Sequence, residues 1–160
     1  MLKLIDEHFE EVIIVALISA MSLLIGVQVF MRYAMSASLS WSEELSRYLF
    51  IWLTYLGVAF AVRRDAHIRV TMLVSLFPPR LRLATRILTH LIFAGFAAFV
   101  MYQGWVMVER TFRFGQTSAS LGIPMGFVYL APVTGFALTL ARLAQATALD
   151  LMRWNEGDAA

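Results

Sequence analysis

The sequence contains no cysteine and comparatively few charged residues. Cysteine is absent from all 160 positions, which excludes a disulfide framework, a thiolate metal site and a cysteine nucleophile. Charged residues make up 15% of the chain and hydrophobic residues 60%, whereas soluble domains carry about 25% charged residues. The mean hydropathy is +0.72. This composition indicates an integral membrane protein.

Charge is also missing from the middle of each long apolar run. We expect an all-α integral membrane protein with four transmembrane helices, at about residues 12–32, 45–62, 87–108 and 124–143. Each run is near the roughly 20 residues that cross the hydrocarbon core. An ionisable side chain inside a span usually marks a path for ions or charged solutes. The chain therefore lacks the feature that transport by this polypeptide alone would need.

Two shorter segments predict interfacial helices. Residues 2–11 place Leu2, Ile5 and Phe9 at helical spacing among acidic side chains, which is typical of an amphipathic lead-in at the membrane surface. A secretory signal would need a positive start, so we expect the first span to be retained. Residues 66–77 are apolar but too short to span, and a surface helix satisfies their backbone better than an unpaired strand.

The distribution of arginine and lysine predicts the orientation in the membrane. Nine of these residues lie on the side of the two termini and the central loop, and four lie on the opposite side. The excess of positive charge marks the cytoplasmic side, which places both termini in the cytoplasm. The nine are Lys3, Arg63, Arg64, Arg69, Arg80, Arg82, Arg86, Arg142 and Arg153, and the four are Arg32, Arg47, Arg110 and Arg113.

The segment from Ser40 to Arg47 predicts the start of the second span. Ser40 and Glu43 have the spacing of a capping box, and Glu43 precedes Arg47 by four residues, which allows an ion pair on one helix face. Two interpretations remain open: local capping with an ion pair, or contact with a partner on the outer face. The candidate partner residues are Arg32, Trp41, Glu43, Glu44, Arg47, Tyr48 and Trp52.

The most basic part of the chain is the loop between the second and third spans. The net charge of the whole chain is only +2, and clustering of its basic residues in one loop argues for membrane orientation and against nucleic-acid binding. Such a loop also fits anionic lipid headgroups. The candidate headgroup residues are Arg63, Arg64, His67, Arg69, Arg80 and Arg82.

Two other functional classes are considered. A haem- or quinone-binding anchor of an oxidoreductase would need imidazoles at matched depth, for which His67 and His90 are the candidates, although both fit simple interfacial side chains. A stand-alone small transporter would need an intramembrane carboxylate, which is absent. No catalytic set, phosphate loop or metal spacing is found, so we expect neither enzyme activity nor a cofactor.

Six short blocks follow one another along nearly the whole chain. They are Phe30-x-Arg32-Tyr33, Ser40-Trp41-Ser42-Glu43-Glu44-Leu45-x-Arg47-Tyr48-Leu49, Trp52-x-x-Tyr55-Leu56-Gly57, Arg63-Arg64-x-x-His67-Ile68-Arg69, Pro78-Pro79-Arg80-Leu81-Arg82 and Gly115-Gln116-Thr117-Ser118-x-x-Leu121-Gly122-Ile123-Pro124. In this order the set resembles the DctQ-type small membrane subunit of TRAP (tripartite ATP-independent periplasmic) transporters. The chain departs from the pattern at Ala119-Ser120, where Pro-Ala is more usual, a change that affects loop stiffness.

The resemblance implies a set of partners. A large multi-span membrane subunit would bind substrate and a coupling ion, and a periplasmic binding protein would deliver a small carboxylate such as a dicarboxylate or a sialic acid. The present chain would be a non-catalytic scaffold in the bacterial inner membrane. This expectation agrees with the absence of ionisable residues from the middle of each span.

Overall fold

Four long helices account for most of the structure. The computed structural model describes the backbone of residues 2–63 and 77–155, with side chains over 11–62, 77–152 and at Trp154. The helices are α1 (Leu2–Ala34), α2 (Ser40–Arg63), α4 (Pro79–Arg113) and α5 (Gly126–Asn155). Each contains a stretch long and apolar enough to cross a membrane. No strand occurs in the described parts of the chain, so the prediction of an all-α membrane protein is confirmed.

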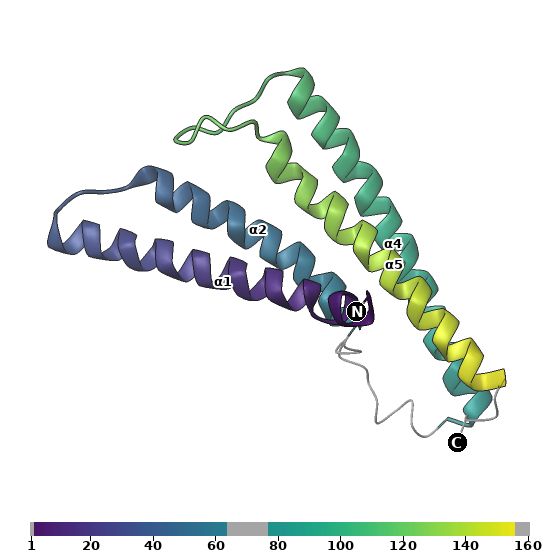
Figure 1. Cartoon of the computed structure of the whole chain (residues 1–160). Coiled ribbons are helices and arrows are strands. Elements are labelled where there is room, and N and C mark those ends of the chain that lie inside the picture. Colours follow the sequence, from purple (N-terminus) through teal and green to yellow (C-terminus); the bar gives the residue numbers. More distant parts are fainter. Residues whose placement is uncertain (1, 64–76, 156–160) are drawn as a thin grey trace.

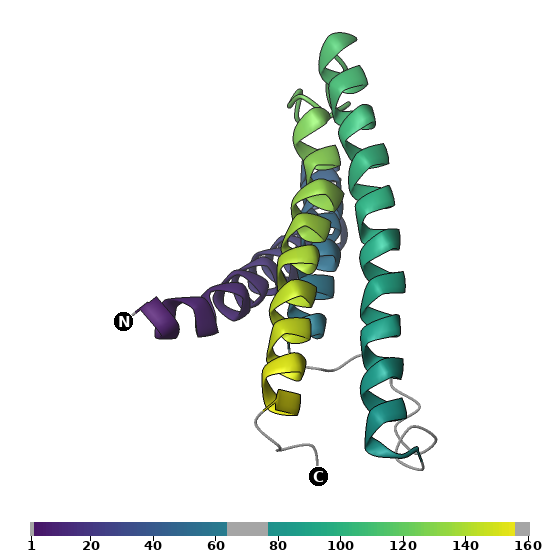
Figure 2. The ribbon, with the colours of Figure 1, turned by 90° about the vertical axis from the view of Figure 1, so that its right-hand side faces the viewer.

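The helices form one open layer instead of a closed bundle. Helix α1 packs on α2, α2 on α5, and α5 on α4, and no other pair of the described helices is in contact. Figure 1 shows the α1–α2 hairpin and the α4–α5 hairpin set at an angle to each other, and Figure 2 shows α5 in front of α2 and beside α4. Over the described residues, the four helices therefore enclose no common interior.

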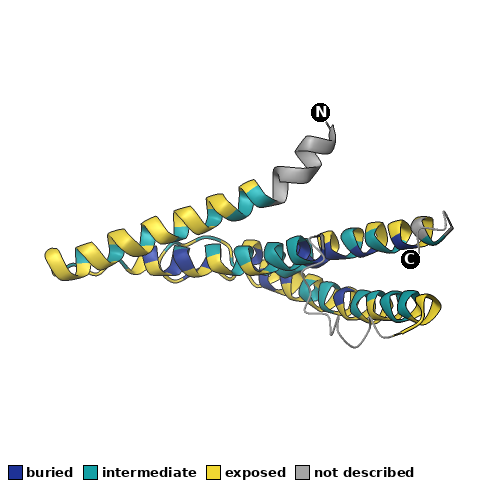
Figure 3. Cartoon of the chain, turned by 90° about the horizontal axis from the view of Figure 1, so that it is seen from below, coloured by how far each residue is buried: buried dark blue, intermediate teal, exposed yellow. Residues whose placement is uncertain are grey.

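Burial follows the two seams that α5 makes with its neighbours. Ala59 on α2, Ala97 on α4 and Ala131 on α5 are fully buried, because small side chains let helix backbones approach closely. In the most apolar 18-residue stretch of each helix, 33% of the residues are buried in α5 and none in α1. Figure 3 shows the buried residues on α2, α4 and α5, while α1 is exposed or half-buried along its described length. Helices α1 and α4 are thus the two free edges of the layer.

Helices α2 and α5 approach each other most closely at Gly135. A methyl group placed on Gly135 would lie 2.6 Å from the carbonyl oxygen of Tyr55, so only glycine fits this crossing. The Tyr55 ring meets Phe136 edge-to-face at 5.8 Å. Phe136 meets Phe96 of α4 in the same way at 5.9 Å. This aromatic row connects the three helices at mid-length.

The helices extend beyond the apolar runs that predicted them. Helix α1 includes residues 2–11 without a break, and whether that segment lies at a membrane surface stays a prediction. Helix α4 begins at Pro79, with Pro78 as its N-cap in an extended conformation, because proline needs no N–H at the first helical position. The interfacial helix expected at 66–77 lies outside the described residues except for Phe77, which is exposed.

Two polar contacts, called the α4–α5 joint below, connect α4 and α5 at the end of the layer away from the loop 114–125. Arg86 and Asp150 form an ion pair at 3.2 Å, with side chains that are 33% and 7% exposed. His90 Nδ1 and Thr147 Oγ1 are hydrogen-bonded at 3.1 Å one turn further along. Because Asp150 is removed from solvent, this pair belongs to the interior of the α4–α5 contact.

Candidate functional site

The loop 114–125 folds back from α4 towards the start of α2. Gly115 and Gly122 have φ of +61° and +67°, the left-handed region in which glycine carries no side-chain penalty. The backbone N–H of Ser118 donates to the carbonyl of Ile123 at 2.8 Å, which closes the loop tip. The end of the layer that carries this loop is called the loop end below.

Glu44 on α2 is the residue that holds this loop. Its carboxylate accepts backbone N–H groups from Ala119 at 3.2 Å, Ser120 at 2.8 Å and Leu121 at 3.1 Å. The hydroxyl of Tyr48 donates to the same carboxylate. Consecutive backbone N–H groups make a concavity suited to an anion, and here an internal carboxylate fills it. Glu44 is only 9% exposed, so the contact ties α2 firmly to the loop.

The local structure of α2 explains why Glu44 and Tyr48 act together. They are four residues apart, so both side chains lie on one face of the helix. The capping box predicted from Ser40 and Glu43 is not formed, because the helix already begins at Ser40. Instead, the hydroxyl of Ser42 donates to the carbonyl of Leu39 at 2.8 Å.

The predicted partner residues do not form one cluster. Glu44 and Tyr48 meet the loop and are buried, while Glu43 and Arg47 are exposed and, within the described residues, are not joined by an ion pair. The spacing allowed that pair, but water competes with it at the surface. The other predicted residues are Arg32 and Trp41, both exposed, and Trp52, which is half-buried.

A hollow of about 510 Å³ lies beside Glu44, between α2, the loop and the start of α5. Its charged lining residues are Glu44 and Arg47, of opposite sign, and the rest of its lining is neutral. The Tyr48 hydroxyl at its edge also lies 3.3 Å from the sulfur of Met125. The lining residues are Glu44, Arg47, Tyr48, Ile51, Gln116, Thr117, Ser118, Ala119, Met125, Val128 and Tyr129.

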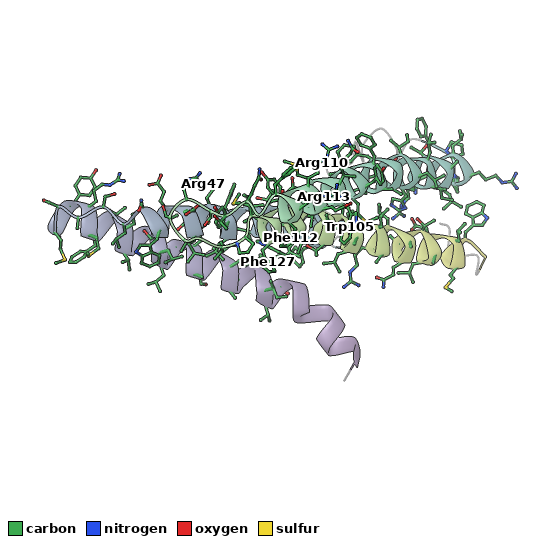
Figure 4. The ribbon with its side chains drawn as sticks, turned by 90° about the horizontal axis from the view of Figure 1, so that it is seen from above. Arg47, Trp105, Arg110, Phe112, Arg113 and Phe127 are labelled. Carbon is green, nitrogen blue, oxygen red and sulfur yellow. The ribbon has the colours of Figure 1, made fainter. Side chains whose placement is uncertain are left out.

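An aromatic contact joins α4 to α5 at the loop end. The rings of Phe112 and Phe127 meet edge-to-face at 5.7 Å. The Phe112 ring lies against Gly126, where an added methyl group would be 2.4 Å from it. Figure 4 shows Arg110 and Arg113 at the same end of α4, and Arg47 on α2. Arg113 pairs with Glu109 within α4.

Sequence reasoning missed the loop residues that Glu44 binds. Ala119, Ser120 and Leu121 contribute backbone N–H groups, which leave no side-chain signature. The glycines at 115 and 122 were the available signal, since two left-handed positions within a short loop indicate a defined turn.

The headgroup candidates are only partly described. Arg80 is exposed and Arg82 is half-buried at the start of α4. The side chain of Arg63 and the residues Arg64, His67 and Arg69 lie outside the described part of the chain. Within the described residues, no group of three or more His, Cys, Asp or Glu side chains could hold a metal ion.

These features define a multi-pass helical membrane protein whose long apolar helices lie side by side, with a structured loop fastened at one end. Residues 21–153 match the family model of the DctQ component of tripartite ATP-independent periplasmic transporters. The chain therefore belongs to this family of TRAP transporter small permease subunits.

Several curated relatives support this assignment. A putative TRAP transporter small permease protein of Haemophilus influenzae is 31% identical, over 83% of this chain and 81% of that protein. The sialic acid TRAP transporter small permease protein of Vibrio cholerae is 27% identical over 89% and 82%. The isethionate TRAP transporter permease protein of Oleidesulfovibrio alaskensis is 31% identical over 88% of this chain, which spans only 23% of that longer relative.

Proposed function

We propose that this chain is the non-catalytic scaffold subunit of an ion-coupled importer of a small carboxylate, such as a dicarboxylate or a sialic acid. A large multi-span membrane subunit carries substrate and coupling ion, and a periplasmic binding protein delivers the substrate. Relatives are named for isethionate, sialic acid, C4-dicarboxylate and ectoine transport, so the selecting residues are expected in the other subunits.

The open layer is the observation that carries this proposal. Helices that enclose no common interior offer no shielded path for a solute. The stretches 12–31, 48–62, 91–108 and 126–141 contain no Asp, Glu, Lys, Arg or His, so moving a charged solute along them would cost its full desolvation. Both faces of the layer remain available to lipid or to a larger protein. A scaffold needs such faces, whereas a conduit needs an interior.

The proposed orientation places both termini in the cytoplasm of a bacterium and the chain in the inner membrane. The loop end then faces the periplasm. The basic residues Arg63, Arg64, His67, Arg69, Arg80 and Arg82 would lie at the cytoplasmic headgroups. This arrangement rests on the excess of arginine and lysine on that side.

The proposed contact with the partners lies at the loop end. Glu44 and Tyr48 fix the shape of the loop, and the exposed residues around them supply the contact surface. In this proposal, Arg32, Trp41, Glu43, Arg47 and Trp52 belong to that surface, while Glu44 and Tyr48 position it.

Co-purification tests the proposal. The chain carries the affinity tag and is co-expressed with the large permease subunit that accompanies it, then purified in mild detergent. We expect the two to elute in a fixed ratio. Glu44→Gln should lower the yield of the large subunit, and Glu43→Gln is the matched control one residue away. Elution of the wild-type chain alone would contradict the proposal.

A further inference from the structure

We infer that the exposed edge of α4 binds a helix of the large membrane subunit, and that the side-chain amide of Gln103 bonds to a polar group of that helix inside the membrane. This inference rests on the proposed function, because it requires that subunit as the partner. It adds the helix of this chain that makes the intramembrane contact and the residue that makes the contact specific.

Gln103 is an exposed polar residue within the apolar part of α4. It belongs to the stretch 91–108, which contains no ionisable residue, and it lies six residues before Glu109, the first charged residue after that stretch. At 1.5 Å per residue, its backbone is about 9 Å inside the end of the apolar stretch. No side-chain hydrogen bond is found for Gln103 among the residues that the structure describes.

An exposed amide at this depth needs a hydrogen-bonding partner. Hydrocarbon offers none, so an amide that faces lipid carries a large desolvation penalty. The Cα–Cβ bonds of a helix tilt towards its N-terminus, which directs the Gln103 side chain away from the loop end, the nearer end of the apolar stretch. A hydroxyl could bond to a carbonyl of its own helix, as Thr111 does with Met107 at 2.7 Å. The longer amide of Gln103 has no such bond, so we expect its partner on another chain.

The neighbours of Gln103 form an exposed seam along α4. Successive residues of this seam are three or four positions apart, which brings them to one side of the helix. They are Ile92, Phe96, Phe99, Gln103, Met107 and Arg110. The buried residues of α4, Ala97, Val108 and Thr111, pack on α5 instead, and α4 lies at an edge of the layer (Figure 2). Two helices interlock through seams of this spacing, and one polar residue within a seam fixes their register.

Helix α1, the other edge of the layer, has no comparable group. Ser19 and Ser22 are exposed there, but serine can bond to a carbonyl of its own helix. Gln28 is half-buried and lies four residues before Arg32, so its backbone is only about 6 Å from the level of that charge. The chemistry of the two edges therefore favours α4 as the one that a protein covers.

Charge argues against a second copy of this chain as the partner. Two copies inserted in the same orientation would bring Arg110 of one seam beside Arg110 of the other. No ion pair is found for Arg110 within the described residues, whereas Glu109 pairs with Arg113. Like charges that face each other across an interface are unfavourable. A different chain can present a polar group to Gln103 without this repulsion, and the large subunit is the membrane partner that the proposed function supplies.

Site-specific photo-cross-linking locates the contact. Phe99, which is 63% exposed in the seam, is replaced by p-benzoylphenylalanine, and the chain is co-expressed with the large permease subunit that accompanies it. Leu23, which is 70% exposed on α1, is replaced in the same way as the matched control on the other edge. We expect irradiation to join the chain to the large subunit from position 99 and not from position 23.

Substitution of the amide tests the hydrogen bond. Gln103→Leu keeps the approximate size of the side chain and removes its donor and acceptor, so we expect the apparent dissociation constant of the detergent-solubilised pair to rise about tenfold. Gln103→Asn, which keeps an amide on a shorter side chain, should raise it less. Gln28→Leu makes the same chemical change on α1 and should leave it unchanged. The unfolding free energy of the chain alone should not fall in Gln103→Leu, because the bond is made to another protein.

The outcomes separate this inference from the proposed function. If the wild-type chain retains no large subunit, the proposed function fails. If it retains the subunit but position 99 cross-links only to lipid or to a second copy of this chain, the inference alone is overturned. An unchanged dissociation constant in Gln103→Leu, or a loss of stability of the isolated chain, would overturn the role of the amide.

Discussion

The carboxylate of Glu44 on α2 accepts the backbone N–H of Ser120 at 2.8 Å, although the two residues are 76 positions apart. This contact joins the α1–α2 hairpin to the loop of the α4–α5 hairpin. The crossing of Tyr55 and Gly135 joins the same two hairpins at mid-length. The hairpins are therefore joined by contacts of different chemistry, one polar at the loop end and one steric at mid-length.

Glu44→Gln tests the polar contact. The amide keeps one acceptor oxygen but replaces the other with a donor that faces backbone N–H groups, so at least one of them loses its partner. We expect amide hydrogen exchange at residues 119–121 to accelerate roughly tenfold. Glu43→Gln removes the same charge from an exposed position and should change nothing. Equal exchange in the two variants would contradict the role assigned to Glu44.

Gly135→Ala tests the steric contact. The new methyl group would lie 2.6 Å from the Tyr55 carbonyl oxygen, so α2 and α5 must separate. We expect a loss of about 1–3 kcal/mol in unfolding free energy, as for other overpacked interiors. Gly95→Ala, where nothing lies within 4 Å of the added methyl group, should be neutral or gain up to about 1 kcal/mol. Reversible unfolding in mixed detergent measures the unfolding free energy of both variants. If Gly135→Ala and Gly95→Ala were equally stable, α2 and α5 would not be in close contact at Gly135.

The ion pairs of α4 provide a comparison of burial. Asp150→Asn removes the carboxylate that pairs with Arg86, whose side chain is 33% exposed. We expect a loss of about 2–3 kcal/mol, below the value for a fully buried pair. Glu109→Gln breaks a pair whose side chains are 70% and 56% exposed, and it should cost less than about 0.5 kcal/mol. The same unfolding assay measures both losses in unfolding free energy. A larger loss for Glu109→Gln than for Asp150→Asn would contradict the greater contribution assigned to the more buried pair.

His90 tests the alternative of a haem-binding anchor. Its Nδ1 is engaged by Thr147 in the α4–α5 joint, which gives it a structural role. We expect the purified complex to show no Soret absorbance and His90→Gln to leave co-elution of the large subunit unchanged. A Soret band that disappears in His90→Gln would favour the oxidoreductase class.

The fold class was predictable because a bilayer imposes a simple rule on composition. Apolar runs without ionisable residues mark the spans, and backbone satisfaction in lipid then requires helices. The ends of the helices were harder to predict from the sequence. Hydropathy indicates which residues lie in the lipid, but it does not indicate where a helix ends. Helix α4 runs from Pro79 to Arg113 and so includes polar residues at both ends that hydropathy does not assign to a span.

The order of helices in the layer could not be predicted from one sequence. In lipid, the faces that meet another helix and the faces that meet acyl chains are both apolar, so hydrophobic periodicity does not separate them. The exposed Phe99 and the buried Ala97 of α4 illustrate this, since both belong to one apolar run. Which glycine meets a neighbouring backbone likewise depends on tertiary placement.

The candidate site was predictable in part. Glu44 and Tyr48 were singled out as candidate contacts for a partner, which stays a prediction, and their contact with the loop of the same chain was not predicted. The pairing of Glu43 with Arg47 was allowed by spacing, but spacing cannot say which of two adjacent glutamates faces inward. That choice is made by the loop, whose donors are backbone groups.

Reconstituted uptake tests the central claim most directly. The chain is placed in proteoliposomes alone, or with the large subunit and the periplasmic binding protein, and uptake of a labelled substrate is driven by an ion gradient. The account predicts no accumulation with the chain alone and gradient-dependent accumulation with all three proteins. Accumulation by the chain alone would contradict the claim that these openly arranged helices, with no ionisable residue in their middle stretches, form a scaffold and not a path.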